Sequence, residues 1–111
     1  MEIEKFLQLT GTLDKKKGKK EDLERLQRFF ERFHLLNRKY LDKEAYDKAQ
    51  GSIASIAEAI ANTVEYLDTE VARLRSKRMK LPFENVELSE MQKVQNRNEA
   101  LLKEYLAQFP E

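Results

Sequence analysis

The sequence contains no cysteine and only one histidine, at position 34. The absence of cysteine excludes disulfide bonds, thiol nucleophiles and thiolate metal ligands, and it fits a reducing compartment. A metal site would need further imidazole or soft donors, which the chain lacks. We therefore expect no metal and no cofactor, and we interpret His34 as a core or boundary residue rather than a catalytic base.

Long hydrophobic runs are also missing. The longest weakly charged stretch, residues 51–64, contains Glu58 and Asn62 and falls short of the ~20 apolar residues that a membrane-spanning helix needs. The N-terminal sequence MEIEKFLQLTG carries acidic residues where a signal peptide has basic ones. These features predict a cytoplasmic protein with no membrane partner.

Motifs that carry catalysis are not found. The sequence has no glycine-rich phosphate loop, no nucleophile elbow and no serine beside a recognisable base. Carboxylate pairs such as Glu65 with Asp68 are explained by solvated ion pairing. We expect a protein that is not an enzyme and that takes no small-molecule substrate.

Glycine and proline number only three and two, too few for the closely spaced turns of an all-β fold. The length of 111 residues fits one domain. We predict a single all-α domain over residues 1–111. It would be a small bundle of three main helices and a short N-terminal helix, with helical-hairpin or coiled-coil-like packing.

The hydrophobic spacing places the first two helices and the segment between them. A short helix is predicted over residues 2–10, with Gly11 as its stop signal. Residues 12–20 are lysine-rich and predict a flexible connection. A clearly amphipathic helix follows over residues 22–41, with apolar residues three or four positions apart.

The third segment has the longest apolar register in the chain, over residues 43–80, with Asp42 as a plausible N-cap. As one helix it would be about 57 Å long at ~1.5 Å per residue, whereas a compact domain of this size is roughly 34 Å across. Either Gly51 and Ser52 interrupt the segment, or the protein is elongated and pairs along the overhang. We favour the interruption, and we place the Ala- and Ser-rich stretch after it at the centre of the bundle.

The C-terminal part is predicted to contain a loop and one more helix. Pro82 ends the third segment, and residues 81–89 are predicted as the loop, with Phe83 and Val86 covering one end of the bundle. Ser89 and the glutamine three positions later match a capping box, so the last helix is expected to begin at Glu90. Asn98 falls on the apolar face of that helix. A polar residue there either fixes the register or the oligomeric state of the helices, or it reaches solvent or caps a neighbouring helix.

The register of the third segment outlasts the predicted helices that could cover it. This predicts an apolar seam open to a partner helix or to a second copy of the chain. The predicted interaction seam consists of Ile53, Ile60, Val64, Leu67, Val71 and Leu74.

The net charge of +1 arises because 21 basic residues nearly balance 20 acidic ones, and the two kinds are unevenly distributed along the chain. Residues 73–80 carry five cations and no acid, whereas residues 42–72 carry two cations and seven acids. If the second and third segments form an antiparallel hairpin, two basic clusters meet at one pole. The predicted basic pole consists of Lys15, Lys16, Lys17, Lys19, Lys20, Arg73, Arg75, Lys77, Arg78 and Lys80.

These patterns favour a non-enzymatic helical interaction protein, acting as an adaptor, chaperone or regulator, that binds a protein partner or itself through the seam. The alternative is a nucleic-acid-binding module that uses the basic pole and binds with strong salt dependence. A third interpretation is that the cations are ordinary solvated surface and complement a helix dipole.

Overall fold

The computed structural model describes residues 1–16 and 20–109. In these ranges all regular structure is helical. The elements are α1 (Glu2–Lys15), α2 (Lys20–Leu36), α3 (Lys43–Ala49), α4 (Ile53–Ser76) and α5 (Pro82–Leu106). The predicted all-α helical bundle is confirmed. None of the described helices has both the length and the apolar character that crossing a bilayer requires.

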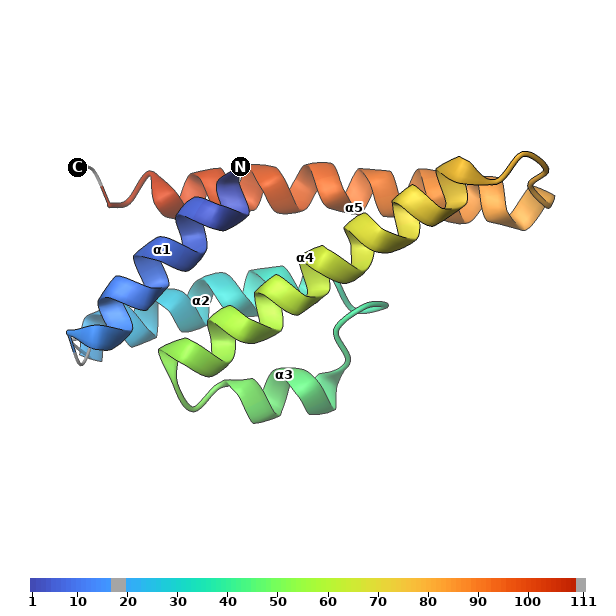
Figure 1. Cartoon of the computed structure of the whole chain (residues 1–111). Helices are drawn as coiled ribbons and strands as arrows, with labels where there is room; N and C mark the ends of the chain where they lie inside the picture. The colour runs from blue at the N-terminus through green and yellow to red at the C-terminus, as the bar shows by residue number, and fades with distance from the viewer. Residues whose placement is uncertain (17–19, 110–111) are drawn as a thin grey trace.

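The helix α4 lies at the centre, as predicted, and packs against each of the other four helices. In Figure 1 it runs diagonally across the molecule, while α5 extends along one side over nearly its whole length. The bundle measures 50 × 31 × 18 Å along its principal axes. Its long dimension arises because α4 and α5 continue beyond the other three helices as a two-helix arm.

The core has two parts. The larger part fills the body of the bundle and is rich in aromatic rings; Phe6, Phe29 and Tyr105 meet there with ring centroids 4.8–5.7 Å apart. The smaller part lies in the arm, where Leu67, Leu74 and their neighbours on α4 pack against α5. Most of the aromatic side chains are thus used in packing rather than displayed as stacking platforms.

The predicted interruption of the third segment is confirmed. α3 ends at Ala49, and Ser52 caps α4: its backbone is extended, and its hydroxyl oxygen accepts a hydrogen bond from the amide of Ser55 at 3.1 Å. Asp42 caps α3 in the same way, accepting from Ala45 at 2.8 Å. Asp42 therefore begins the long apolar stretch, and the cap at Ser52 divides it into two helices.

The chain reverses direction at this break, which changes the topology. α3 runs back alongside α4, so α2 and α4 run in broadly the same direction (Figure 1). The predicted antiparallel hairpin therefore holds for α3, which runs back along α2, but it is wrong for α4, so the end of the third segment does not return to the start of α2. The second helix also ends earlier than predicted, at Leu36 rather than at residue 41.

The first helix does not stop at Gly11. α1 continues to Lys15 because Thr10 is buried and Leu13 packs against the core, and this packing outweighs the modest helix penalty of one glycine. The predicted flexible connection over residues 12–20 is therefore helical at both of its ends. Residues 17–19 of that connection lie outside the described part of the chain.

The last helix begins at Pro82, so the predicted loop over residues 81–89 and the start at Glu90 are wrong. Proline suits the first helical position because its fixed φ fits a helix and its missing N–H has no partner there. The carboxylate of Glu84 then accepts a hydrogen bond from the amide of Leu81 at 3.1 Å. These two features make an effective helix start, and Ser89 lies inside the helix.

A buried pair of amides joins the end of α2 to the middle of α5. Asn37 Nδ2 donates to Asn98 Oδ1 at 2.8 Å, and Asn98 Nδ2 donates to Asn37 Oδ1 at 2.9 Å. Asn37 Nδ2 also donates to the carbonyl of Phe33 at 2.7 Å. Both asparagines are almost fully buried. Asn98 thus finds its partner within the chain, and only one register of α5 against α2 satisfies both amides.

We expect Asn98→Leu to lower the free energy of unfolding by about 2 kcal/mol, because it leaves the Asn37 oxygen buried without a donor. The double substitution of Asn37 and Asn98 by Leu removes both polar groups together. Its cost should therefore be clearly smaller than the sum of the two single costs. Urea denaturation of the four proteins measures this coupling, and strictly additive losses would contradict it.

We expect Gly11→Ala to raise the free energy of unfolding by about 0.5–1 kcal/mol, because Gly11 lies inside α1 and an added Cβ meets no atom within 4 Å. Thermal or urea denaturation measures the change. A loss of stability would show instead that α1 ends at Gly11.

Candidate interaction surfaces

The predicted interaction seam belongs to the core. Ile53, Ile60, Leu67, Val71 and Leu74 are buried, and Val64 is half-buried. The predicted overhang assumed that no other helix covers the outer part of this register. In the structure α5 runs along it from Pro82, and Leu88, Met91 and Val94 of α5 cover the outer part of the seam. A partner would reach the five buried residues only by opening the bundle, whereas Val64 is partly accessible.

The predicted basic pole is divided between two ends of the molecule. Residues 73–80 lie at the outer end of the α4–α5 arm, whereas Lys15, Lys16 and Lys20 lie at the opposite end, where α1 leads to α2 (Figure 1). Lys17 and Lys19 fall outside the described residues. The prediction of one shared pole is wrong because α3 reverses the chain before α4 begins. α4 therefore runs in the same direction as α2, and its last turn lies far from the first turn of α2.

The outer end of the arm, residues 73–86, is here called the hairpin tip. It comprises the last turn of α4, the connection and the first turn of α5. Four large apolar side chains are exposed there: Met79 by 90%, Leu81 by 56%, Phe83 by 63% and Val86 by 59%. Phe83 and Val86 do not cover the end of the bundle as predicted. The sequence signal for this surface is one large apolar residue within the run of five cations at residues 73–80 and three more in the six positions after it.

Glu84 holds the hairpin tip together. Its side chain is almost fully buried and accepts from Lys77 Nζ at 2.5 Å and from the Leu81 amide at 3.1 Å. The hydrogen bond from Lys77, followed by that from the Leu81 backbone, lowers the pKa of Glu84 below its ordinary value. The exposed apolar side chains are therefore carried on an ordered connection.

The cations of the hairpin tip differ in their partners. Arg73 Nε donates to Glu70 at 2.7 Å, and Lys77 is bound by Glu84. With the Gln92 amide turned so that its oxygen faces Arg75, that oxygen accepts from the guanidinium at 2.8 and 3.0 Å. Among the described residues no carboxylate pairs with Arg75, Arg78 or Lys80. These three positive charges remain available to a partner.

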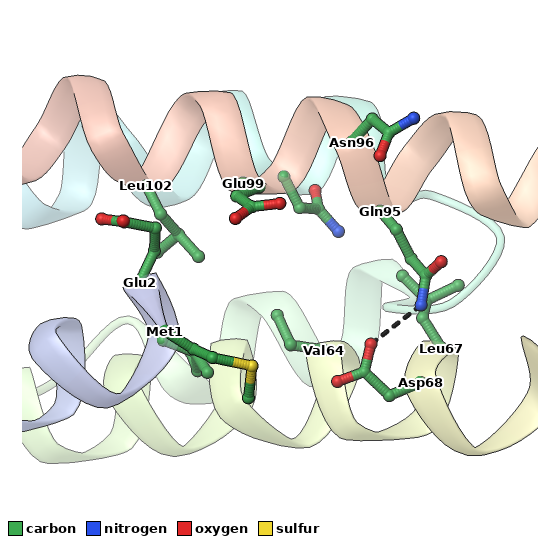
Figure 2. A pocket seen from close by; sticks show the side chains of 11 residues that line it. Met1, Glu2, Val64, Leu67, Asp68, Gln95, Asn96, Glu99 and Leu102 are labelled. Atoms are coloured by element: carbon green, nitrogen blue, oxygen red, sulfur yellow. Dashed lines mark hydrogen bonds between the residues drawn. The ribbon is translucent and has the colours of Figure 1, made fainter. Parts of the chain in front are cut away.

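A pocket of about 240 Å³ lies where the N-terminal end of α1 meets α4 and α5 (Figure 2). Glu2, Asp68 and Glu99 give it an acidic lining, and Gln95 Nε2 donates to Asp68 Oδ1 at 2.8 Å. In the described part of the chain no three His, Asp or Glu side chains converge as metal ligands. The pocket is an acidic depression at the junction of these three helices.

His34 is engaged in packing. Its ring stacks on Tyr46 of α3 with centroids 4.2 Å apart and planes 11° apart. The side chain is half-buried. This contact holds the short helix α3 against α2, and it matches the boundary position that the sequence predicts for His34.

We expect the order of the hairpin tip to depend on pH through Glu84. Because the folded state lowers the pKa of this carboxyl below its ordinary value, its stabilising effect is complete above the ordinary glutamate pKa. The effect is lost as the pH falls through the lower folded value. NMR shifts of the Leu81 amide and the Lys77 side chain should titrate in this acid range in the wild type.

Glu84→Gln should abolish that titration and broaden the signals of the tip at neutral pH. Glu87→Gln provides a matched control on the same helix and should leave both unchanged. A Leu81 shift that titrates equally in the Glu84→Gln protein would contradict the assigned role.

Comparison with known proteins gives this chain no relative: no family model, no curated protein and no solved structure matches it. The candidate surfaces are accordingly assigned from the chain's own residues. Of these surfaces, the hairpin tip combines the greatest apolar exposure with a run of eight residues, 73–80, that holds five cations and no acid.

Proposed function

We propose that this protein is a non-enzymatic helical interaction protein that docks its hairpin tip on a protein partner with an acidic, partly apolar surface. The observation that carries this proposal is the exposure by 56–90% of four large apolar side chains within residues 79–86, beside five cations in residues 73–80. The buried seam is not part of the proposed surface.

Burial of the exposed apolar side chains of the tip would supply the favourable free energy of binding. Clustered exposed apolar groups are unfavourable in water, and contiguous patches of this kind mark interaction sites. Phenylalanine, methionine and arginine are also enriched at interface centres, while most lysines remain at the rim. Phe83 and Met79 are therefore expected to be the anchors, with Leu81 and Val86 beside them.

The charge of the tip indicates which partner fits. Glu70 and Glu84 bind Arg73 and Lys77, and the other three cations of the tip have no carboxylate partner among the described residues. A partner that presents acidic side chains around an apolar patch would satisfy both features. Opposite charge would also accelerate the encounter and orient the two surfaces.

The tip is already ordered before a partner arrives. Glu84 joins the connection to α5, and α4 and α5 pack against each other along the arm. A preorganised surface loses little conformational entropy on binding, so more of the contact energy appears as affinity. A projecting arm also allows contact without displacing the body of the bundle (Figure 1).

Nucleic-acid binding remains the second candidate, because residues 73–80 contain five cations within eight positions. Such binding would come mainly from phosphate contacts and would weaken steeply with salt. It would leave the four exposed apolar side chains of the tip without a role. The two candidates therefore differ in which residues matter and in their response to salt.

A fluorescent acidic amphipathic helical peptide, its scrambled version and a DNA duplex serve as defined probes. We expect the amphipathic peptide to bind more tightly than the other two and to retain binding at high salt. Leu81→Ala with Phe83→Ala should weaken that binding about tenfold or more, a loss of ~1.4 kcal/mol. Anisotropy at low and high salt measures all three affinities.

Leu35→Ala is the matched control, because Leu35 is exposed by 54% on the body of the bundle. This variant should bind as the wild type does, and circular dichroism should show equal helicity in all the proteins. Unchanged peptide binding by the double variant would overturn the proposed surface. Tighter DNA binding that depends on Arg75 and Arg78 and falls steeply with salt would favour the second candidate.

A further inference from the structure

A second unassigned site lies in the body of the bundle, at the end remote from the hairpin tip (Figure 1). It is a groove of about 220 Å³ between α2 and α5. Arg25, Arg28 and Arg32 line one side at positions that share a helical face, and Tyr105 lines the other side. The volume is smaller than that of a typical pocket for a drug-sized ligand. It suits a small anion or the charged end of a larger molecule.

The three arginines are not equivalent. Arg32 is bound by Glu104 through two hydrogen bonds, at 2.9 and 3.2 Å. Arg25 is half-buried, with its guanidinium carbon 5.2 Å from the centre of the Phe109 ring. No carboxylate of the described residues forms an ion pair with Arg25 or Arg28. Two guanidinium groups on one helix face are thus free for an anion.

Glu21 and Glu24 of α2 form no ion pair with these two groups. Glu21 and Glu24 precede Arg25 and Arg28 by four residues, a spacing that favours ion pairs on a helix. Glu24 instead lies 4.0 Å from Lys20. The surplus positive charge of the groove therefore persists in the folded chain.

Tyr105 supplies a second, independent observation. Its side chain is 99% buried, yet its hydroxyl has no hydrogen-bond partner, the only such buried side-chain atom in the described residues. Burial raises the pKa of Tyr105 to about 12, while the charges of Arg25 and Asp22 act on it in opposite directions. The hydroxyl therefore stays protonated near Arg25, as a donor without an acceptor. Buried polar groups are rarely left in this condition without a ligand or an ion to satisfy them.

We propose that this groove binds a phosphate group through Arg25 and Arg28, and that a small movement of the side chains around Tyr105 opens its hydroxyl, which has almost no accessible surface in the free protein, to the same anion. A phosphate carries nearly two negative charges and several acceptor oxygens. It can therefore face two guanidinium groups and still accept from a phenol. Guanidinium groups are well suited to phosphate because their planar array of donors matches its oxygens. Asp22 offsets part of the positive charge, so modest affinity is expected.

The proposal is tested by NMR titration of the full chain with inorganic phosphate at constant ionic strength. We expect saturable shifts of the Arg25 and Arg28 side-chain NεH signals and of amides around Tyr105. Arg28→Gln should weaken binding about tenfold. Tyr105→Phe should weaken it about threefold without loss of thermal stability, because the hydroxyl it removes has no partner in the folded chain.

Two control variants separate this site from general attraction of anions. Arg38→Gln removes an exposed cation near the end of α2, outside the groove, and should bind phosphate as the wild type does. Arg75→Gln with Arg78→Gln removes charge from the hairpin tip and should also leave phosphate binding unchanged. If either control weakens binding as much as Arg28→Gln does, the proposal is overturned.

A parallel titration with phosphoserine distinguishes free phosphate from a phosphate ester. Tighter binding of phosphoserine, lost in Arg28→Gln, would identify a phosphomonoester as the ligand. Equal or weaker binding would identify inorganic phosphate. Shifts that rise linearly without saturation for both compounds would overturn the proposal. Because none of the three groove residues lies in the hairpin tip, this outcome is independent of the proposed docking function.

Discussion

The arrangement of the whole bundle depends on the buried amide pair of Asn37 and Asn98. Two side chains taken out of water can satisfy each other only when α2 and α5 meet in one register, because a shift by one residue would leave the Asn98 amide and the Asn37 oxygen without partners. Along α5, Asn98 lies between the residues that pack into the aromatic body core and those that pack into the smaller arm core. It therefore fixes where the body ends and where α4 and α5 continue alone.

That register gives the two ends of α5 different roles. At its beginning, Pro82 and Glu84 start the helix early enough to cover the outer part of α4, which buries the apolar seam and leaves the connection ordered. At its other end, Tyr105 is placed beneath the arginines of α2. One helix thus supports an apolar and basic tip at one extreme and a basic groove at the other. The two proposed sites differ in chemistry, because the tip exposes large apolar side chains and the groove has a buried phenol.

Local patterns predicted a large part of the fold. The apolar spacing located the faces of α2, α4 and α5. Asp42 was identified as a cap, and the interruption near Gly51 was expected because an unbroken helix exceeds the size of a compact domain. The wrongly predicted helix boundaries are those where tertiary packing or a stronger cap outweighs a local start or stop signal in the sequence. Gly11 is a weak stop when Thr10 and Leu13 on either side pack inward, and Ser89 is a weak start when Pro82 and Glu84 provide an earlier one.

The sequence by itself determined the all-α class, the amphipathic faces and the break between α3 and α4. These depend on residues a few positions apart, whose propensities and caps act locally. Only the tertiary structure decided that the basic clusters lie at opposite ends, that the seam is covered, and that Asn98 pairs with Asn37 rather than with a second chain. The groove of Arg25, Arg28 and Tyr105 also joins residues from helices far apart in the chain. Such contacts depend on the direction that each helix takes after its turn, and no local spacing of residues encodes that direction.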